Sequence, residues 1–242
     1  MSGSSRIDSL IEMHSDIHAV VFDLDGTLLD RRRSFERFVR GQWDRFSDSL
    51  RDVHPDEYVE SMIRLDRDGY APRSELFTGL AARFGLPSDL ADTLLFDYRA
   101  GFPAACLLFP DVPATLAALR ASGLKLGLIT NGSVRMQSRK LECLSLTSTF
   151  DAILISAAEG ISKPDPDIFR RALERLHADN DRSVFVGDHP EVDIEGARAV
   201  GMRAVWRRDP TISRPIEADA IVDQIGDLIA LLSLEPGGHP SS

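Results

Sequence analysis

Two aspartates one residue apart follow an apolar stretch near the start of the chain. Residues 19–22 are apolar, and Asp23, Asp25, Gly26 and Thr27 come directly after them. Residues i and i+2 of an extended backbone point to the same side, so both carboxylates can face one small volume just past a strand. Two such groups repel each other, and a hard divalent cation with oxygen ligands relieves that repulsion. The spacing therefore predicts a Mg²⁺ site, with an ordinary acidic Asp-Gly turn as the alternative.

Further polar residues lie at, or just after, the ends of three other stretches expected to be strands. They are Thr130, Asn131, Lys163, Asp188 and Asp193. A hydroxyl with successive backbone amides next to a helix start can hold an anion, a lysine adds a mobile positive charge, and carboxylates are ligands for Mg²⁺. Each motif alone is also typical of a turn or a helix cap. Together they indicate phosphoryl transfer.

The apolar pattern predicts alternating strands and helices at both ends of the chain, with an all-helical insert between them. Strands are expected at 17–23, 124–129, 150–155, 183–188, 202–206 and 218–222, and helices at 112–121, 134–144, 162–176, 192–200 and 225–232. The insert is expected to hold helices at 34–47, 55–65, 74–84 and 88–102. Strands that alternate with helices pair in parallel through right-handed crossovers, and the carboxyl ends of parallel strands share one edge. We therefore expect an α/β fold.

That fold is a three-layer, doubly wound parallel sheet of the Rossmann-like type. Its expected residues are 1–29 and 108–242, and residues 30–107 are expected to form an α-helical cap domain. The predicted sheet would bring the polar groups together at one edge.

The first motif, Phe22-Asp23-Leu24-Asp25-Gly26-Thr27-Leu28, resembles the first signature of the haloacid dehalogenase-like (HAD) hydrolase superfamily. The resemblance implies that Asp23 is a nucleophile and metal ligand. It implies that Asp25 is a general acid/base whose backbone carbonyl also binds metal. The helical insert is similar to the type-one caps of that superfamily. Its dehalogenases lack an aspartate at the position of Asp25, because a halide needs no proton to leave, so Asp25 indicates a phosphate ester.

The other motifs resemble the remaining three signatures in order, so the resemblance covers residues 17–206. It implies that Thr130, with the Asn131 loop, binds phosphate and that Lys163 acts in catalysis and phosphate binding. It also implies that Asp188 is a direct Mg²⁺ ligand. Asp193 matches a second acid, which binds metal through water or holds the lysine.

Composition excludes several other classes of function. The chain of 242 residues has 28 Lys and Arg against 38 Asp and Glu, a net charge of -10, which argues against a nucleic-acid or anionic-membrane binder. No apolar run is long enough to span a bilayer, and the first 16 residues do not resemble a secretory signal, so we expect a cytoplasmic location. Cys106 and Cys143 form no CxxC pair and are expected to be buried thiols, and not a disulfide or a metal site.

The predicted function is Mg²⁺-dependent hydrolysis of a small phosphorylated metabolite by a monomer or homodimer, through an aspartyl-phosphate on Asp23. A phosphosugar mutase of the β-phosphoglucomutase type and a non-catalytic phosphometabolite-binding protein are the alternatives. Substrate selection is predicted at Tyr70 and Arg73, in a Gly/Pro turn of the helical insert. The alternative for this turn is a solvated loop.

Overall fold

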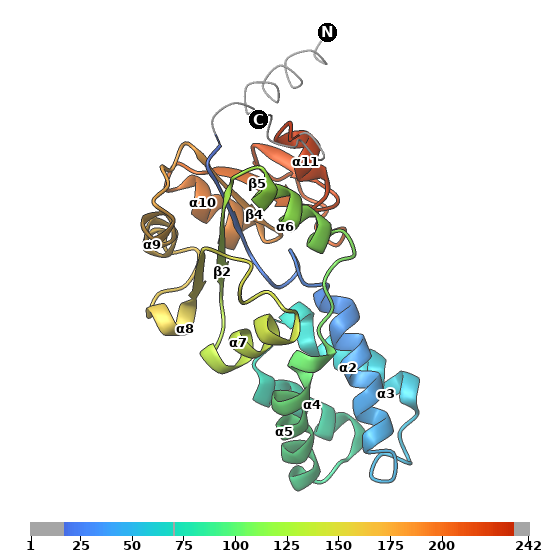
Figure 1. Ribbon diagram of the computed structural model, residues 1–242. Helices are drawn as coiled ribbons and strands as arrows, with labels where there is room; N and C mark the ends of the chain where they lie inside the picture. Colours follow the sequence, from blue (N-terminus) through green and yellow to red (C-terminus); the bar gives the residue numbers. More distant parts are fainter. Residues whose placement is uncertain (1–16, 70, 235–242) are drawn as a thin grey trace. The chain divides into compact units, whose positions relative to one another are not determined.

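The computed structural model describes residues 17–69 and 71–234, and the chain divides into two compact units (Figure 1). One unit comprises Met1–Leu29 and Leu108–Ser242, and the other comprises Asp30–Leu107. We call them the α/β unit and the helical unit. Within the described ranges, no helix combines the length and the apolar character that crossing a membrane requires.

The α/β unit is built on one six-stranded sheet in which every strand pair is parallel. Its strands are β1 (Ala19–Phe22), β2 (Lys125–Thr130), β3 (Ala152–Ile155), β4 (Ser183–Gly187), β5 (Arg203–Arg207) and β6 (Ala220–Val222). They lie in the order β3-β2-β1-β4-β5-β6. All four residues of β1 are buried, as expected for a central strand covered on both faces.

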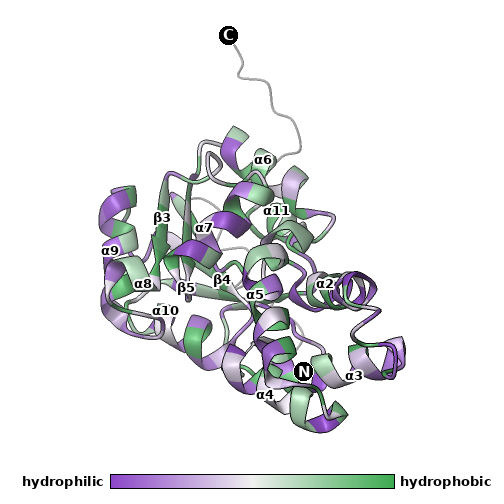
Figure 2. Cartoon of the chain, turned by 90° about the horizontal axis from the view of Figure 1, so that it is seen from below, coloured by the Kyte–Doolittle hydropathy of each residue, from purple (hydrophilic) through white to green (hydrophobic). Residues whose placement is uncertain are grey.

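Helices cover both faces of this sheet. They are α6 (Val112–Ala121), α7 (Val134–Cys143), α8 (Ser156–Glu159), α9 (Pro166–Leu176), α10 (Gly196–Arg198) and α11 (Asp227–Leu231). In Figure 1, α9 and α10 lie on one side of the strands, and α6 and α11 lie on the other. Figure 2 shows β3 in the colour of hydrophobic residues, whereas α7 and α9 also carry hydrophilic segments. The predicted α/β fold with a doubly wound parallel sheet is therefore confirmed.

The predicted elements differ from the observed ones at a few places. The helix expected at 192–200 is a π-helical turn, Pro190–Glu195, that continues into α10. The short helix α8 was not predicted, because a four-residue element carries too little periodicity to detect. The first helix of the insert begins at Arg31 instead of residue 34, because the Asp30 side chain accepts a hydrogen bond from the Arg33 amide and caps it.

The helical unit contains α2 (Arg31–Arg45), α3 (Pro55–Asp66), α4 (Arg73–Phe84) and α5 (Ser88–Ala105), with a 3₁₀ turn at Arg67–Gly69. Its core is aromatic: Tyr98 stacks on Phe102 with the ring centroids 5.0 Å apart, and Phe38 meets both rings edge to face. Buried aromatic pairs of this kind add to the stability that their burial supplies. The unit thus has a core of its own.

Candidate active site

The polar residues predicted to converge follow the carboxyl ends of neighbouring strands. Phe22 pairs with Leu128 of β2 and with Val186 of β4, so the chain leaves these three strands at nearly the same level of the sheet. Asp23 follows β1 directly, and its amide donates to the Val186 carbonyl at 2.9 Å. Thr130 ends β2, and Asp188 follows β4. The parallel topology is therefore what gathers the site.

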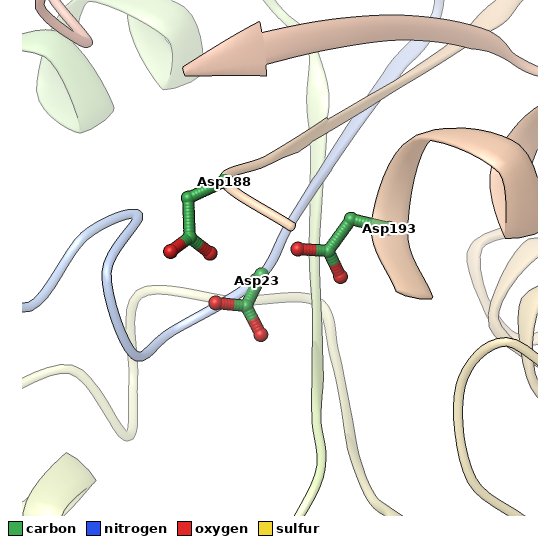
Figure 3. Close-up of side chains that lie close together, drawn as sticks. All are labelled: Asp23, Asp188 and Asp193. Atoms are coloured by element: carbon green, nitrogen blue, oxygen red, sulfur yellow. The ribbon is translucent and has the colours of Figure 1, made fainter. Parts of the chain in front are cut away.

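Three carboxylates form the acidic centre of this edge. Asp23, Asp188 and Asp193 each offer a carboxylate oxygen, and these oxygens lie within 4.8 Å of one another (Figure 3). Among the described residues, Asp23 Oδ2 is buried and has no hydrogen-bond partner. An unsatisfied buried oxygen is costly unless a ligand completes it. The donor set therefore fits a hard divalent cation.

Lys163 lies between two of these acids. Its Nζ donates to Asp23 Oδ1 at 2.6 Å and to Asp193 Oδ1 at 2.7 Å, and its side chain is buried. The second Asp193 oxygen accepts from the His189 amide at 3.0 Å. Asp193 is thus engaged at both oxygens inside the unit. Of the two possibilities left open for Asp193, this arrangement favours holding the lysine.

The ionisation of the cluster follows from burial and charge. Burial raises the pKa of Asp23 to about 7; Lys163 opposes this shift, and Asp193 reinforces it. Burial also raises the pKa of Asp188, with the charges of Asp23 and Asp193 adding to the effect. Burial by itself would lower the pKa of Lys163, but the carboxylates of Asp193 and Asp23 outweigh it, so this pKa is raised and the ammonium keeps its proton.

Two glycines are needed for the acids to come this close. Gly26 has φ +91°, and a Cβ there would lie 2.1 Å from Asp188 Oδ2. A Cβ at Gly187 would lie 2.5 Å from the Asp193 carboxylate. Any other residue at these two positions would displace a carboxylate.

The loop after β2 differs in detail from the predicted anion cradle. The Thr130 hydroxyl is buried, but the Gly132 amide donates to Ser156 Oγ at 2.9 Å. The Asn131 side chain donates to the Lys163 carbonyl at 2.9 Å and accepts from the Lys163 amide at 3.0 Å. The Asn131 side chain therefore ties the Lys163 backbone to the end of β2.

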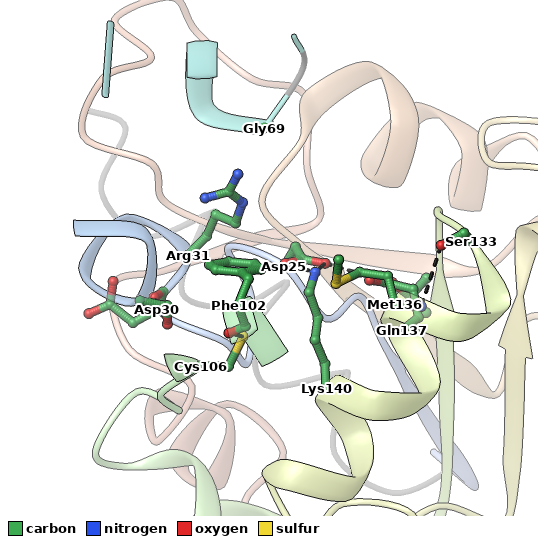
Figure 4. A network of polar contacts seen from close by, with 12 residues as sticks. Asp25, Asp30, Arg31, Gly69, Phe102, Cys106, Ser133, Met136, Gln137 and Lys140 are labelled. Atoms are coloured by element: carbon green, nitrogen blue, oxygen red, sulfur yellow. Dashed lines mark hydrogen bonds and ion pairs between the residues drawn. The ribbon is translucent and has the colours of Figure 1, made fainter. Parts of the chain in front are cut away.

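Two polar residues of α7 that were not predicted contact Asp25. Lys140 Nζ lies 2.7 and 2.8 Å from the two Asp25 oxygens, and Gln137 Nε2 donates to Asp25 Oδ2 at 2.9 Å (Figure 4). Both side chains are buried. The available signal was their spacing: residues 137, 140 and 141 share one helix face, and Leu141 is apolar. Polar residues at buried helix positions indicate a specific partner.

The chain was compared with known proteins. The family model of haloacid dehalogenase-like hydrolases matches residues 17–201. A phosphoserine phosphatase of Thermus thermophilus is 43% identical over 122 residues, which are 50% of this chain and 48% of that protein. A glyceraldehyde 3-phosphate phosphatase of Pyrococcus furiosus is 28% identical over 91% of this chain and 95% of that protein. Among solved structures, the crystal structure of a HAD phosphatase from Thermococcus onnurineus superposes with a TM-score of 0.64. The two sequences are 30% identical, and the alignment covers 90% of this chain and 99% of the other.

The chain belongs to the haloacid dehalogenase-like hydrolase family. The resemblance carried by the four short motifs is thereby confirmed, and so is the prediction of a phosphatase enzyme. The roles of the individual site residues stay predictions.

The predicted substrate contacts of this HAD-like hydrolase lie in the helical unit. Tyr70 falls outside the described residues. Arg73, the first residue of α4, forms an ion pair with Asp66 and donates to the Gly69 carbonyl at 2.6 Å. Its guanidinium also lies over the Tyr98 ring, 5.4 Å from the centroid. The Arg73 side chain is therefore held by contacts within the helical unit, whereas the alternative of a solvated loop would leave it free in solvent.

Proposed function

We propose that this HAD-like phosphatase hydrolyses a small phosphorylated metabolite through a phosphoryl group carried on Asp23. The observation that carries the proposal is the environment of Asp23. One oxygen is held by the Lys163 ammonium at 2.6 Å, and the other is buried with no partner among the described residues. If the partnerless oxygen holds the divalent cation, the carboxylate is fixed in direction, and its other oxygen, beside the Lys163 ammonium, is the one that can attack phosphorus.

The chemistry proceeds in two displacements. An Asp23 oxygen forms a bond to phosphorus while the bond to the leaving oxygen breaks, and the electron pair goes to that oxygen. Protonated Asp25 gives its proton to the leaving oxygen, and the alcohol departs. Ionised Asp25 then takes a proton from water as the water attacks phosphorus, which releases inorganic phosphate and restores the Asp23 carboxylate. Lys163 stabilises negative charge on the phosphoryl oxygens.

A divalent cation, which we take to be Mg²⁺, fits the acidic centre. Asp23, Asp188 and the Asp25 backbone carbonyl would hold it, and Asp193 would hold Lys163. When bound, the cation supplies positive charge that neutralises the acids and the phosphoryl oxygens. If all three acids are ionised, their three negative charges and the one positive charge of Lys163 leave a net charge of -2, which a divalent cation balances.

Support for a small-molecule substrate comes from the relatives. Those named above are a phosphoserine phosphatase and a glyceraldehyde 3-phosphate phosphatase, and a further relative from Halopiger xanaduensis is a ribulose-1,5-bisphosphate 5-phosphatase. Each name gives a phosphate monoester of a small metabolite. We propose the same class of substrate, a small phosphate monoester, for this chain, and we do not propose a particular compound.

The test is phosphate release from a panel of phosphorylated metabolites, with Mg²⁺ and with EDTA. The wild-type protein should release phosphate only with the metal, and Asp23→Asn should lower turnover by about 10⁴-fold or more while keeping its circular dichroism spectrum. Asp181→Asn is the matched control, because Asp181 is exposed and precedes β4 at the opposite edge of the sheet. Near-normal turnover by Asp23→Asn would overturn the proposal. Rearranged sugar phosphate without phosphate release would identify a mutase instead.

Arg73 remains our proposed selector of the leaving group. Because Arg73 forms an ion pair with Asp66, the alternative is that Arg73 only stabilises the helical unit and does not contact substrate. The two are separable: a selector changes KM for some members of the panel, whereas a structural residue changes the melting temperature alone. Arg73→Ala should be compared with Arg64→Ala, because Arg64 is an exposed cation of the same unit. Unchanged KM across the panel would remove Arg73 from the substrate site.

A further inference from the structure

The inner face of α7 carries a buried lysine and a buried glutamine against Asp25. Lys140 is 5% exposed and Gln137 is 2% exposed. Burying an ammonium is unfavourable unless a charged partner compensates, and here the Asp25 carboxylate does so with both oxygens within 2.8 Å of Nζ. Two buried polar side chains of α7 thus contact a single carboxylate.

Gln137 contacts Thr130 as well as Asp25. Its Nε2 donates to Asp25 Oδ2 at 2.9 Å and to Thr130 Oγ1 at 2.5 Å. An ionised carboxylate only accepts hydrogen bonds, so the nitrogen end of the amide must face Asp25. Because Thr130 Oγ1 accepts from Gln137, the hydroxyl proton of Thr130 is available to donate elsewhere. A phosphate oxygen is the acceptor that such a donor suits.

We infer that Lys140 and Gln137 are positioning residues of the phosphatase reaction. Lys140 fixes the direction of the Asp25 carboxyl group. Its contacts with both oxygens belong to the ionised group, which takes a proton from water; when one oxygen carries the proton for the leaving group, Lys140 still holds the other. Gln137 fixes both the Asp25 carboxyl group and the donor orientation of the Thr130 hydroxyl. This inference rests on the proposed role of Asp25 as the acid, so its test must separate the two.

Helix α7 makes both contacts possible at once. It begins at Val134, four residues after Thr130, and Ser133 caps it by accepting from the Met136 amide. Residues three apart on a helix are neighbours on one face, so Gln137 and Lys140 both reach Asp25. A rigid element holds such groups more accurately than a loop does.

The discriminating measurement is the dependence of kcat/KM on the leaving group. This constant covers the steps up to departure of the alcohol, so it reports proton donation and not the later attack of water. An alkyl phosphate needs a proton on its leaving oxygen, whereas p-nitrophenyl phosphate leaves as a stable anion. Loss of correct proton donation therefore affects the alkyl ester selectively.

We expect Lys140→Met to lower kcat/KM by about 10 to 100-fold for the alkyl ester and by less than about threefold for p-nitrophenyl phosphate. Lys140→Arg should recover most of the loss, because a guanidinium can also hold a carboxylate at both oxygens. Arg139→Met is the matched control, since it removes the neighbouring cation of α7 and should leave both constants within about twofold of wild type. An equal loss on both esters, or a gain in Lys140→Met, would overturn the role of Lys140.

Gln137→Leu has a second signature. It should lower kcat/KM for the alkyl ester as Lys140→Met does, and it should also raise the inhibition constant of inorganic phosphate by about 3 to 10-fold through Thr130. Lys140→Met should leave that inhibition constant within about twofold of wild type. An unchanged inhibition constant in Gln137→Leu would remove the link to Thr130.

Asp25→Asn separates this inference from the proposed function. If Asp25 is the acid, Asp25→Asn shows the same leaving-group selectivity with a larger loss, of about 10² to 10⁴-fold on the alkyl ester. Selectivity in Asp25→Asn but not in Lys140→Met would reject the positioning role and keep the proposed function. Absence of selectivity in Asp25→Asn would reject the acid role itself. Lys140→Arg and Gln137→Leu keep the test decisive if Lys140→Met does not fold.

Discussion

The two units each bury a cluster of acids and cations, and the charges are unbalanced in opposite directions. In the α/β unit, three carboxylates lie together, and one ammonium, that of Lys163, contacts two of them. In the helical unit, the Asp66 carboxylate lies between two guanidinium groups: Arg31 reaches both of its oxygens, at 2.8 and 2.9 Å, and Arg73 pairs with it as well. The first cluster has too few cations for its acids, and the second has more cations than acids.

The difference separates a reactive site from a structural one. Burial raises the pKa of Asp23, the charge of Asp193 adds to the rise, and one buried Asp23 oxygen has no partner among the described residues, so this cluster is costly until a cation or substrate completes it. Asp66, in contrast, joins the end of α3 to the starts of α2 and α4, and Arg31 also lies over the Phe35 and Phe102 rings at 5.0 and 5.2 Å. These contacts link three helices of the helical unit through one carboxylate.

The largest expected effect is on the reactive cluster. Asp188→Asn removes a proposed metal ligand, so we expect turnover to fall by about 10³-fold or more and the thermal stabilisation by Mg²⁺ to disappear. For a bound metal at 100 times its dissociation constant, that stabilisation is about 2.7 kcal/mol. Calorimetry with and without Mg²⁺ measures it, with Asp181→Asn as the control. If Mg²⁺ stabilised Asp188→Asn against heat as much as it stabilises the wild type, the metal would bind elsewhere.

In the structural cluster, the expected effect is on stability. Asp66→Asn leaves two guanidinium groups without their shared carboxylate, and we expect the free energy of unfolding to fall by about 3 to 5 kcal/mol. In EDTA, Asp188→Asn should have the opposite sign, because it removes a charge from a cluster with surplus acids. Urea unfolding of both variants gives the two signs. Equal destabilisation by both variants would erase the distinction between the clusters.

The pH dependence of the metal-free protein gives a third test. The pKa of Asp23 rises from 3.8 in its ordinary state to about 7 in the folded state, so the folded protein keeps a proton that the unfolded chain loses. Stability from this group is present below about pH 4 and is lost as the pH rises toward 7. The advantage of Asp23→Asn over wild type in EDTA should therefore grow by about 2 to 4 kcal/mol across this range. Excess Mg²⁺ should abolish the trend, and a pH-independent difference would contradict the assigned environment.

The smallest effect is expected at a third cluster, which has the composition of the Asp66 cluster but more exposed arginines. Glu159 pairs with Arg171 and Arg175, whose side chains are 39% and 44% exposed. The hydrogen bond from Arg175 lowers the pKa of Glu159 below its ordinary 4.5. Glu159→Gln should therefore cost about 1 kcal/mol or less at neutral pH, and the cost should vanish as the pH falls below about 4. A cost that matched Asp66→Asn would show that burial does not distinguish them.

The site was predictable where backbone topology alone determines it. Thr130 ends one strand of the parallel sheet, Asp23 and Asp188 directly follow two others, and a parallel sheet places such strand ends on one edge. The fold and the family followed from the same pattern. Contacts that depend on side-chain direction were harder to predict: the spacing of Gln137, Lys140 and Leu141 places them on one helix face, but it does not name their partner, and polar residues of a helix usually face solvent. The Asn131 side chain illustrates the same limit: its hydrogen bonds to Lys163 depend on how two loops meet.

The stereochemical course at phosphorus tests the nucleophilic role of Asp23 most directly. A thiophosphate monoester made chiral with oxygen isotopes would be hydrolysed in water that carries a third isotope, and the configuration of the released thiophosphate would be determined. Each in-line displacement inverts phosphorus, so attack by Asp23 followed by attack by water predicts net retention. Net inversion would mean that water attacks the substrate directly, and it would contradict a phosphoryl group on Asp23.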